Sequence, residues 1–105
     1  MSETADQYAK RMFDREREDL RSILKTPYGK RFVWKWLSRC GVFRQSFVQG
    51  ESDSTAFAEG RRSIGNALLM EVFDVRPESY VEMTKAAKED EDGRKAVAAN
   101  ESDEA

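Results

Sequence analysis

Apolar residues recur at helical spacing near the start of the chain and predict a first helix over residues 4–25. Gln7 follows Thr4 by three residues, which fits a capping box at the helix N-terminus. The apolar positions after it are Tyr8, Met12, Leu20, Ile23 and Leu24. The middle of this segment, 14–19, is almost entirely charged, so we expect the helix to lie partly off the core and to pack on a neighbour.

A second helix is predicted from Pro27 to Cys40. Thr26 can cap its N-terminus, and Gly41 can end it in the left-handed conformation. One face collects five apolar residues at helical spacing: Phe32, Val33, Trp36, Leu37 and Cys40. We expect this face to form the centre of the core, with Trp34 on the opposite side beside Arg31, Lys35 and Ser38.

Residues 42–52 predict an ordered loop with Phe43 and Phe47 as anchors. Asp53 or Ser54 then caps a third helix that runs to about Asp74. Its apolar stripe consists of Phe57, Ile64, Leu68, Val72 and Val75. We expect Phe57, Ile64 and Leu68 to join the core, and the small residues Gly60, Ser63, Gly65 and Ala67 to allow another backbone to pack closely.

The pair Arg76-Pro77 breaks the third helix and starts a fourth, in which Tyr80, Met83 and Ala87 face inwards. Beyond Lys88 the apolar pattern fails, and we expect residues 90–105 to form a disordered acidic tail. The prediction is an all-α fold, a small bundle of about four helices. It divides into an N-terminal helix (1–26), a helical core domain (27–89) and the tail.

The composition permits only a small core and separates charge along the chain. Of 105 residues, 39% are hydrophobic and 36% charged, and the net charge is −2. Residues 25–50 contain six cations and no acid, whereas residues 89–105 contain seven acids against Arg94 and Lys95. Blocks of opposite sign suggest a basic face and a solvated acidic segment.

The sequence contains one cysteine and no recognisable targeting or membrane-spanning segment. Cys40 is the only cysteine, so an internal disulfide is impossible, and its place on the apolar face suggests a buried, inert thiol. The first residues lack the apolar core of a signal peptide, and no apolar run approaches the length of a membrane span. We therefore expect a soluble protein, made in the cytoplasm, with no membrane partner.

The residues that most enzymes and metal sites require are missing. The sequence has no histidine, which removes the commonest general base and most zinc sites. An acidic run at 89–92 precedes Gly93, but the flanking positions of a calcium loop would be Lys88 and Ala99, which are not ligands. No phosphate-binding glycine loop is present. We predict a protein that is not an enzyme and needs no cofactor.

The main hypothesis is therefore a binding role, and the residue that most supports it is Trp34. Among polar neighbours it can be buried by a partner protein or a second copy of this chain, by the first helix, or by a stacked base. The expected partner-binding residues are Trp34, Arg31, Lys35, Arg39, Arg44, Arg61 and Arg62. Nucleic acid is the weaker alternative, because the isoelectric point is near 5.3 and the predicted loop is too long for a helix-turn-helix.

Two stretches resemble a known family. They are RFVWKWLSRCGVFRQSF (31–47) and STAFAEGRRSIGNALL (54–69), which combine an aromatic-rich helix, a cysteine-glycine helix stop and a glycine-arginine-arginine segment. They are similar to a family of short proteins of tailed bacteriophages, mostly podophage-like, first named on a Bordetella phage. The resemblance covers about residues 29–85 and leaves out the first helix and the tail. Gly41, Gly60, Arg61, Arg62 and Gly65 occupy its characteristic positions.

The resemblance implies a small virion or virion-assembly protein without catalytic residues. We expect a structural component of a phage particle that binds other virion proteins in several copies, at the portal and head–tail junction or inside the head. The alternatives are a nucleic-acid-binding phage protein and a transient scaffold. We also expect that Trp36→Ala destabilises the fold, whereas Trp34→Ala impairs partner binding.

Overall fold

Four helices make up the protein, as the sequence predicts. The computed structural model describes residues 2–43 and 52–104, apart from the side chains of residues 52–54 and 104. Its helices are α1 (Ala5–Leu24), α2 (Pro27–Arg39), α3 (Ser52–Val75) and α4 (Glu78–Glu104), and the described residues contain no strand. The all-α prediction is confirmed. Most of the predicted loop, with Arg44 and Phe47, lies outside the described residues.

The predicted helix ends are confirmed by hydrogen bonds. In the capping box of α1, the Gln7 N–H donates to Thr4 Oγ1 at 3.1 Å and the Thr4 N–H donates to Gln7 Oε1 at 2.8 Å. Thr26 caps α2, and its hydroxyl oxygen accepts from the Gly29 N–H at 3.0 Å. After α2, Gly41 takes the left-handed conformation with φ of +76°. Side-chain caps thus fix where α1 and α2 start, and the backbone conformation of Gly41 fixes where α2 ends.

A tight corner joins α1 to α2. The Thr26 hydroxyl donates to the Ile23 carbonyl at 2.8 Å, which satisfies one of the last carbonyls of α1. Gly29 is buried in this corner, and a Cβ atom placed on it would lie 2.0 Å from the Ile23 oxygen. Only a residue without a side chain fits there, so Gly29 fixes the face of α2 that meets α1.

The core is small and takes side chains from all four helices. Its buried hydrophobic residues are Leu24 of α1, Val33 and Leu37 of α2, Val72 and Val75 of α3, and Met83 of α4. Leu20, Trp34, Val42, Leu68 and Leu69 pack around them and are partly buried. Leu37 is fully buried, and Leu68 lies at the edge of this cluster.

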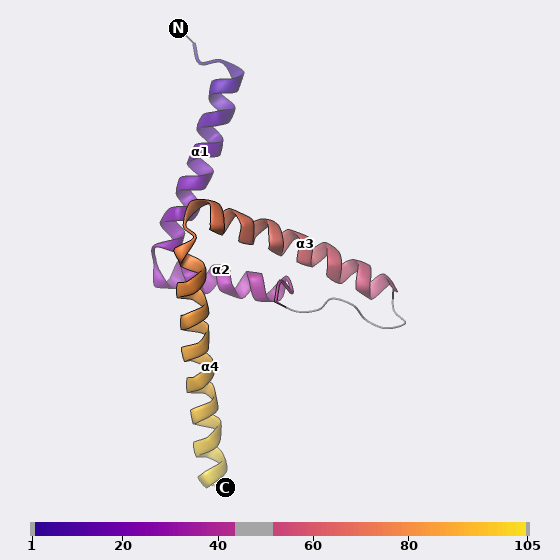
Figure 1. The fold of residues 1–105 in the computed structure, drawn as a ribbon, viewed down its shortest axis with the longest axis vertical. Helices are drawn as coiled ribbons and strands as arrows, with labels where there is room; N and C mark the ends of the chain where they lie inside the picture. The colour runs from indigo at the N-terminus through magenta and orange to yellow at the C-terminus, as the bar shows by residue number, and fades with distance from the viewer. Residues whose placement is uncertain (1, 44–51, 105) are drawn as a thin grey trace.

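Two residues predicted for the core lie outside it. Phe57 and Ile64 are 72% and 70% exposed. Both belong to the N-terminal part of α3, which extends beyond the end of α2 in Figure 1. Gly65 marks where the two helices still meet, because a Cβ atom on it would lie 2.6 Å from Cys40 Cβ. Phe57 and Ile64 precede this contact and do not belong to the hydrophobic cluster of the described residues.

Polar contacts fix α1 to the C-terminal end of α3. Arg17 Nε donates to Asp74 Oδ2 at 2.7 Å, and Arg21 Nε donates to the Val75 carbonyl at 3.0 Å. The hydrogen bond from Arg17 holds the pKa of Asp74 below its usual value. Arg21 supplies a donor to a carbonyl that the end of α3 leaves unpaired. The charged middle of α1 is thus partly used in packing on α3.

The molecule is elongated and flat. α1 and α4 leave the core in opposite directions, while α2 and α3 project to one side (Figure 1). The extents are 74 × 39 × 17 Å and the radius of gyration is 19.0 Å, against about 13 Å for a compact chain of this length. Much of each long helix therefore has no neighbouring helix in the described part of the chain.

The expected disorder of residues 90–105 is not confirmed. α4 continues as a helix to Glu104, although every residue from 88 to 103 is exposed. Local interactions support this helix: Lys88 pairs with Asp92 at 3.1 Å, and Arg94 pairs with Glu91. Alanines at 96, 98 and 99 also favour helix. The missing apolar stripe correctly indicated that this segment does not pack on the core. It did not predict disorder correctly, because local ion pairs and backbone hydrogen bonds can form a helix without such packing.

Candidate protein-binding surface

The inward face of α2 differs from the predicted one. Val33 and Leu37 are buried as expected, but Phe32 and Trp36 are 57% and 41% exposed. This corrects their assignment to the core. The physical reason is the corner at Gly29, which lies on the Val33 side of α2 and turns that side towards α1. Apolar residues cover more than half of the circumference of this helix, so spacing alone does not select the buried face.

The exposed side of α2 carries two parallel rows of side chains. Tyr28, Phe32 and Trp36 follow one another at intervals of four residues and form an aromatic row. Arg31, Lys35 and Arg39 have the same interval and form a cationic row beside it, and all three are exposed. Each row is about 12 Å long at 1.5 Å per residue. We call these six residues the aromatic–cationic face.

Within this face the cations lie over the rings. Lys35 Nζ is 4.9 Å from the centroid of the Phe32 ring and 5.5 Å from that of Trp36, and the Arg39 guanidinium is 5.3 Å from Trp36. Phe32 and Trp36 meet edge to face at 6.4 Å. Such contacts are modest in water and strengthen when the pair is desolvated. The arrangement is therefore suited to being covered by another molecule.

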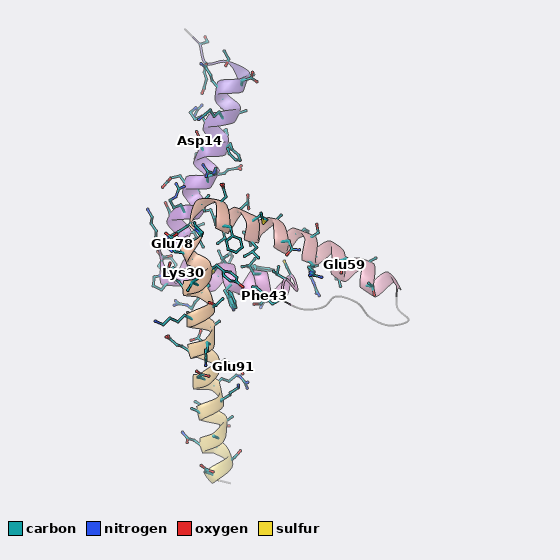
Figure 2. The ribbon with its side chains drawn as sticks, in the orientation of Figure 1. Asp14, Lys30, Phe43, Glu59, Glu78 and Glu91 are labelled. Atoms are coloured by element: carbon teal, nitrogen blue, oxygen red, sulfur yellow. The ribbon has the colours of Figure 1, made fainter. Side chains whose placement is uncertain are left out.

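Trp34 does not lie on the side of α2 away from the core, which corrects its predicted placement. It is partly buried, packs against the core and stacks on Phe43 with ring centroids 4.8 Å apart. Figure 2 shows Phe43 near the end of α2. Three alternatives were considered for Trp34, and the structure shows burial inside the chain. The covering groups are Phe43 and the core, not the first helix alone. The remaining part of its ring faces a groove.

This groove of about 420 Å³ lies between α2 and α4. Arg31, Trp34 and Lys35 line its α2 side, and Glu89 and Asp90 line its α4 side. Opposite charges therefore face each other across an apolar floor that includes Met83 and alanines. The groove brings together three of the residues predicted to bind a partner.

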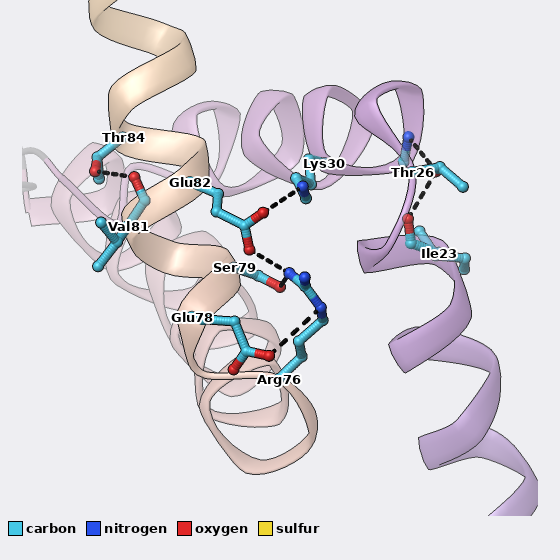
Figure 3. A network of polar contacts seen from close by, with 10 residues as sticks. Ile23, Thr26, Lys30, Arg76, Glu78, Ser79, Val81, Glu82 and Thr84 are labelled. Atoms are coloured by element: carbon cyan, nitrogen blue, oxygen red, sulfur yellow. Dashed lines mark hydrogen bonds and ion pairs between the residues drawn. The ribbon is translucent and has the colours of Figure 1, made fainter.

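A partly buried polar network holds α4 against α2 at the base of the groove. Lys30 Nζ donates to Glu82 Oε2 at 2.6 Å, and Arg76 pairs with Glu82 Oε1 (Figure 3). Arg76 Nη1 also donates to the hydroxyl of Ser79, which is fully buried, at 2.8 Å. The hydrogen bonds from Lys30, and then Arg76, hold the pKa of Glu82 below its usual value. Lys30 is thus occupied inside the fold.

The predicted arginines of α3 have separate surroundings. Arg61 is exposed, with its guanidinium 5.8 Å from the Phe57 ring centroid. Arg62 is half-buried and lies 3.8 Å from Glu59. Both belong to the part of α3 near the end of α2, whereas Trp34 faces the α4 side. The structure does not bring these arginines together with Trp34 at one site, and Arg44 lies outside the described residues.

The three glycines singled out in the sequence also differ. Gly41 has the positive φ expected at a helix stop. Gly65 allows close packing, since its Cβ position is 2.5 Å from Val42 Cγ2 and 2.6 Å from Cys40 Cβ. Gly60 has open space around it, which corrects its expected role in close packing within the chain. Cys40 is only half-buried.

Several important residues were missed by the sequence analysis. Tyr28 completes the aromatic row, and its spacing to Phe32 could have indicated this. Gly29 lies three residues after the capping threonine. Its position indicated the tight corner less clearly than the spacing of Tyr28 indicated the aromatic row, because helices tolerate single glycines. The ion pair of Lys30 with Glu82 had no signal, because it depends on how α4 meets α2.

Chemical sites of other kinds are not evident in the described part of the chain. There, no group of three or more His, Cys, Asp or Glu side chains is placed to hold a metal ion. None of the helices over residues 2–43 and 52–104 combines the length and apolar character of a membrane span. The surface features that stand out are the aromatic–cationic face and the groove beside it.

A comparison with protein families identifies the class of protein. A family model described as Bbp19-like phage protein matches residues 9–85. This is most of the chain, and the protein therefore belongs to this family of bacteriophage proteins. The match begins within α1, earlier than the resemblance over 29–85 suggested, and ends before the exposed part of α4. No curated protein and no solved structure matches the chain.

Proposed function

We propose that this phage protein is a non-enzymatic structural component of the virion that binds other virion subunits. The observation that carries the proposal is the aromatic–cationic face. Exposed aromatic rings and arginines are the residues most enriched at the energetic centres of protein interfaces. Here they are gathered on one helix of a protein whose core, over residues 2–43 and 52–104, contains six buried hydrophobic residues.

The shape of the molecule supports the same proposal. A chain of this size that folds alone normally approaches a sphere, because this buries the most apolar surface. This chain instead exposes aromatic or aliphatic side chains on every helix, among them Tyr8, Phe13, Met70 and Val97. Subunits of an assembly can use such surface for contacts with neighbours. As positions in the particle we propose the portal and head–tail junction, or the inside of the head.

Mass spectrometry of purified virions tests this proposal directly. We expect the protein in mature particles in several copies, measured against a subunit of known number. Phage lacking the gene should be complemented by the wild-type chain and by Lys25→Ala, which changes an exposed cation away from the aromatic–cationic face. Absence from mature particles would overturn the proposal. Presence only in precursor particles would identify a transient scaffold instead.

A nucleic-acid-binding function is the second candidate, favoured by the cationic row. Arg31, Lys35 and Arg39 are exposed next to aromatic rings that bases could stack on. Against it, the chain is acidic overall. We expect binding to duplex or single-stranded oligonucleotides no tighter than about micromolar at physiological salt, the nonspecific range. Submicromolar binding there, lost in Lys35→Ala/Arg39→Ala, would favour nucleic acid as the partner.

A further inference from the structure

We propose that copies of this protein associate with one another, with the end of α4 of one copy docking on the aromatic–cationic face of the next. We call residues 89–104 of α4 the acidic arm. The inference deepens the proposed function and rests on it, because it names the first partner as a second copy of the chain.

The aromatic–cationic face carries three exposed cations, of which Arg31 and Lys35 face Glu89 and Asp90 across the groove without forming an ion pair. Within residues 2–43 and 52–104, no ion pair joins Arg31, Lys35 or Arg39 to an acid. Other cations in the same region are used: Lys30 pairs with Glu82, and Arg17 pairs with Asp74. An acidic partner would therefore form more new ion pairs at this face than elsewhere on α2.

The acidic arm has the opposite imbalance. It carries seven acids against Arg94 and Lys95. The pairs Lys88–Asp92 and Glu91–Arg94 occupy two of these acids. In the described part of the chain, Glu89, Asp90, Glu101 and Asp103 have no ion pair. Figure 2 shows Glu91 on the part of α4 that extends past the core.

One side of the acidic arm matches the length and character of the aromatic–cationic face. Asp90, Gly93, Val97 and Glu101 are spaced by three, four and four residues and share one side of the helix. Val97 is exposed and apolar, with a carboxylate on either side along the helix. The two carboxylates are separated by about 16 Å along the helix axis, close to the 12 Å length of the cationic row. Val97 can thus contact the rings while the acids meet the cations.

Gly93 fits this arrangement. A Cβ atom on it would have nothing within 4 Å, so the isolated chain offers no steric reason for glycine in the middle of a helix. Glycine is a poor helix former, and its usual use in such a place is the close approach of another group. An aromatic ring of α2 from a second copy would supply that group.

The contact must form between different copies. α4 runs straight away from the core, while α2 extends across its direction (Figure 1), so only the first residues of the acidic arm, Glu89 and Asp90, lie beside α2 of the same chain. The interface joins two different surfaces and is therefore heterologous. Repetition of such a contact gives a closed ring or an open chain, depending on the rotation between copies.

The test uses the full-length protein in sedimentation velocity and light scattering over a range of concentrations. We expect species larger than the 12.1 kDa monomer that grow with concentration and diminish as salt is raised. The face variant Lys35→Ala/Arg39→Ala and the arm variant Glu101→Lys/Asp103→Lys should each weaken association about tenfold or more. All four side chains are exposed, so the fold should tolerate both variants.

Mixing the two variants gives the decisive measurement. The face variant keeps an intact arm, and the arm variant keeps an intact face, so the mixture has one functional contact. It should form a 1:1 heterodimer and nothing larger, although neither variant associates alone. As matched controls, Lys25→Ala/Lys85→Ala and Glu16→Lys/Asp19→Lys change the same charges at exposed positions elsewhere. These controls should associate like the wild type.

Three results would overturn the inference. The first is a wild-type protein that stays monomeric at all concentrations, and the second is association that neither variant weakens. The third is a mixture that forms no heterodimer. A monomeric protein that is nevertheless present in virions would leave the proposed function standing. A wild type that associates as expected but is absent from particles would instead overturn the proposed function.

Discussion

Side chains on α2 that are neighbours in sequence differ in burial. Leu37 is fully buried, whereas Trp36 is exposed and lies under the cations Lys35 and Arg39. The difference follows from the direction in which α1, α3 and α4 approach α2. Size and hydrophobicity alone would favour the tryptophan for the core.

At this scale we predict that Leu37→Ala destabilises the protein far more than Trp36→Ala. Leu37→Ala leaves a cavity in the core and should lower the free energy of unfolding by about 2–5 kcal/mol. Trp36→Ala removes a residue that is 41% exposed and should cost about 1 kcal/mol or less. Thermal and urea unfolding of the free proteins measure both. If Trp36→Ala were as damaging as Leu37→Ala, the observed face of α2 would be wrong.

A second prediction concerns the pH dependence that Glu82 contributes. Lys30 and Arg76 hold its pKa below the ordinary value of 4.5, so the folded state binds a proton less readily than the unfolded state. The stabilisation is therefore complete above that ordinary value and is lost as the pH falls through the lower, folded-state pKa. Glu82→Gln should reduce stability at neutral pH and flatten its decline in acid.

Thermal melts from pH 7 to pH 3 measure this difference. Glu16→Gln is the matched control, because it removes an exposed carboxylate that makes no ion pair among the described residues. It should leave the acid-side slope nearly as in the wild type. An equal slope for the wild type and Glu82→Gln would show that the network does not hold α4 as described.

The helices differ in what fixes them in place. α2 is held at both ends, by the corner at Gly29 and by the contact of Gly65 with Cys40 and Val42. The N-terminal part of α3 and the distal part of α4 are held mainly by their own hydrogen bonds. This contrast leads to one prediction for each kind of element.

We predict opposite effects of alanine at two helical glycines. Gly29→Ala places a Cβ atom against backbone at 2.0 Å, and the forced shift should cost about 1–3 kcal/mol. Gly60→Ala is the matched control in open space, where the better helix former should stabilise by about 0.5–1 kcal/mol. Urea unfolding measures whether each substitution lowers or raises the free energy of unfolding. Stabilisation by Gly29→Ala would contradict the tight corner.

Amide hydrogen exchange should separate the two halves of α4. Residues 80–84 lie beside the core and the Glu82 network, whereas residues 90–103 are exposed throughout. A helix supported only by local bonds opens easily, so we expect weak protection in the second half and strong protection in the first. Equal protection in dilute, monomeric protein would indicate a contact that the fold does not show. If the acidic arm docks on a second copy, its protection should rise with concentration.

The whole molecule is a small core from which long helices extend. Its radius of gyration of 19.0 Å reflects α1 and α4, which leave the core in opposite directions. Such a shape gives a large surface for few residues. Among the described residues, stability depends mainly on six buried hydrophobic side chains. This shape supports the proposal that the protein is a subunit of an assembly.

Small-angle X-ray scattering tests this shape. At the lowest concentrations, and in the Lys35→Ala/Arg39→Ala variant, we expect a radius of gyration near 19.0 Å. The compact alternative for 105 residues is about 13 Å. A value close to the compact one would mean that α1 or α4 folds back on the core. The variant matters because association would raise the measured value in the wild type.

Much of the local structure was determined by the sequence alone. The capping box at Thr4, the cap at Thr26 and the positive φ at Gly41 all depend on residues within a few positions of one another. Such interactions are fixed by local geometry, and they were predicted correctly. The all-α class follows from the same local preferences. The missing histidine and the single cysteine likewise come directly from the composition.

Only the tertiary structure decided which faces are buried. Phe32 and Trp36 of α2, and Phe57 and Ile64 of α3, have the spacing of core residues and are exposed. Burial requires a neighbour, and the neighbours come from helices distant in sequence whose angles depend on a glycine corner and on the Glu82 network. The helix at residues 90–104 shows the converse, because a helix can form without the packing that an apolar stripe would indicate. Local bonds are encoded by adjacent residues, whereas contacts between helices depend on the whole chain.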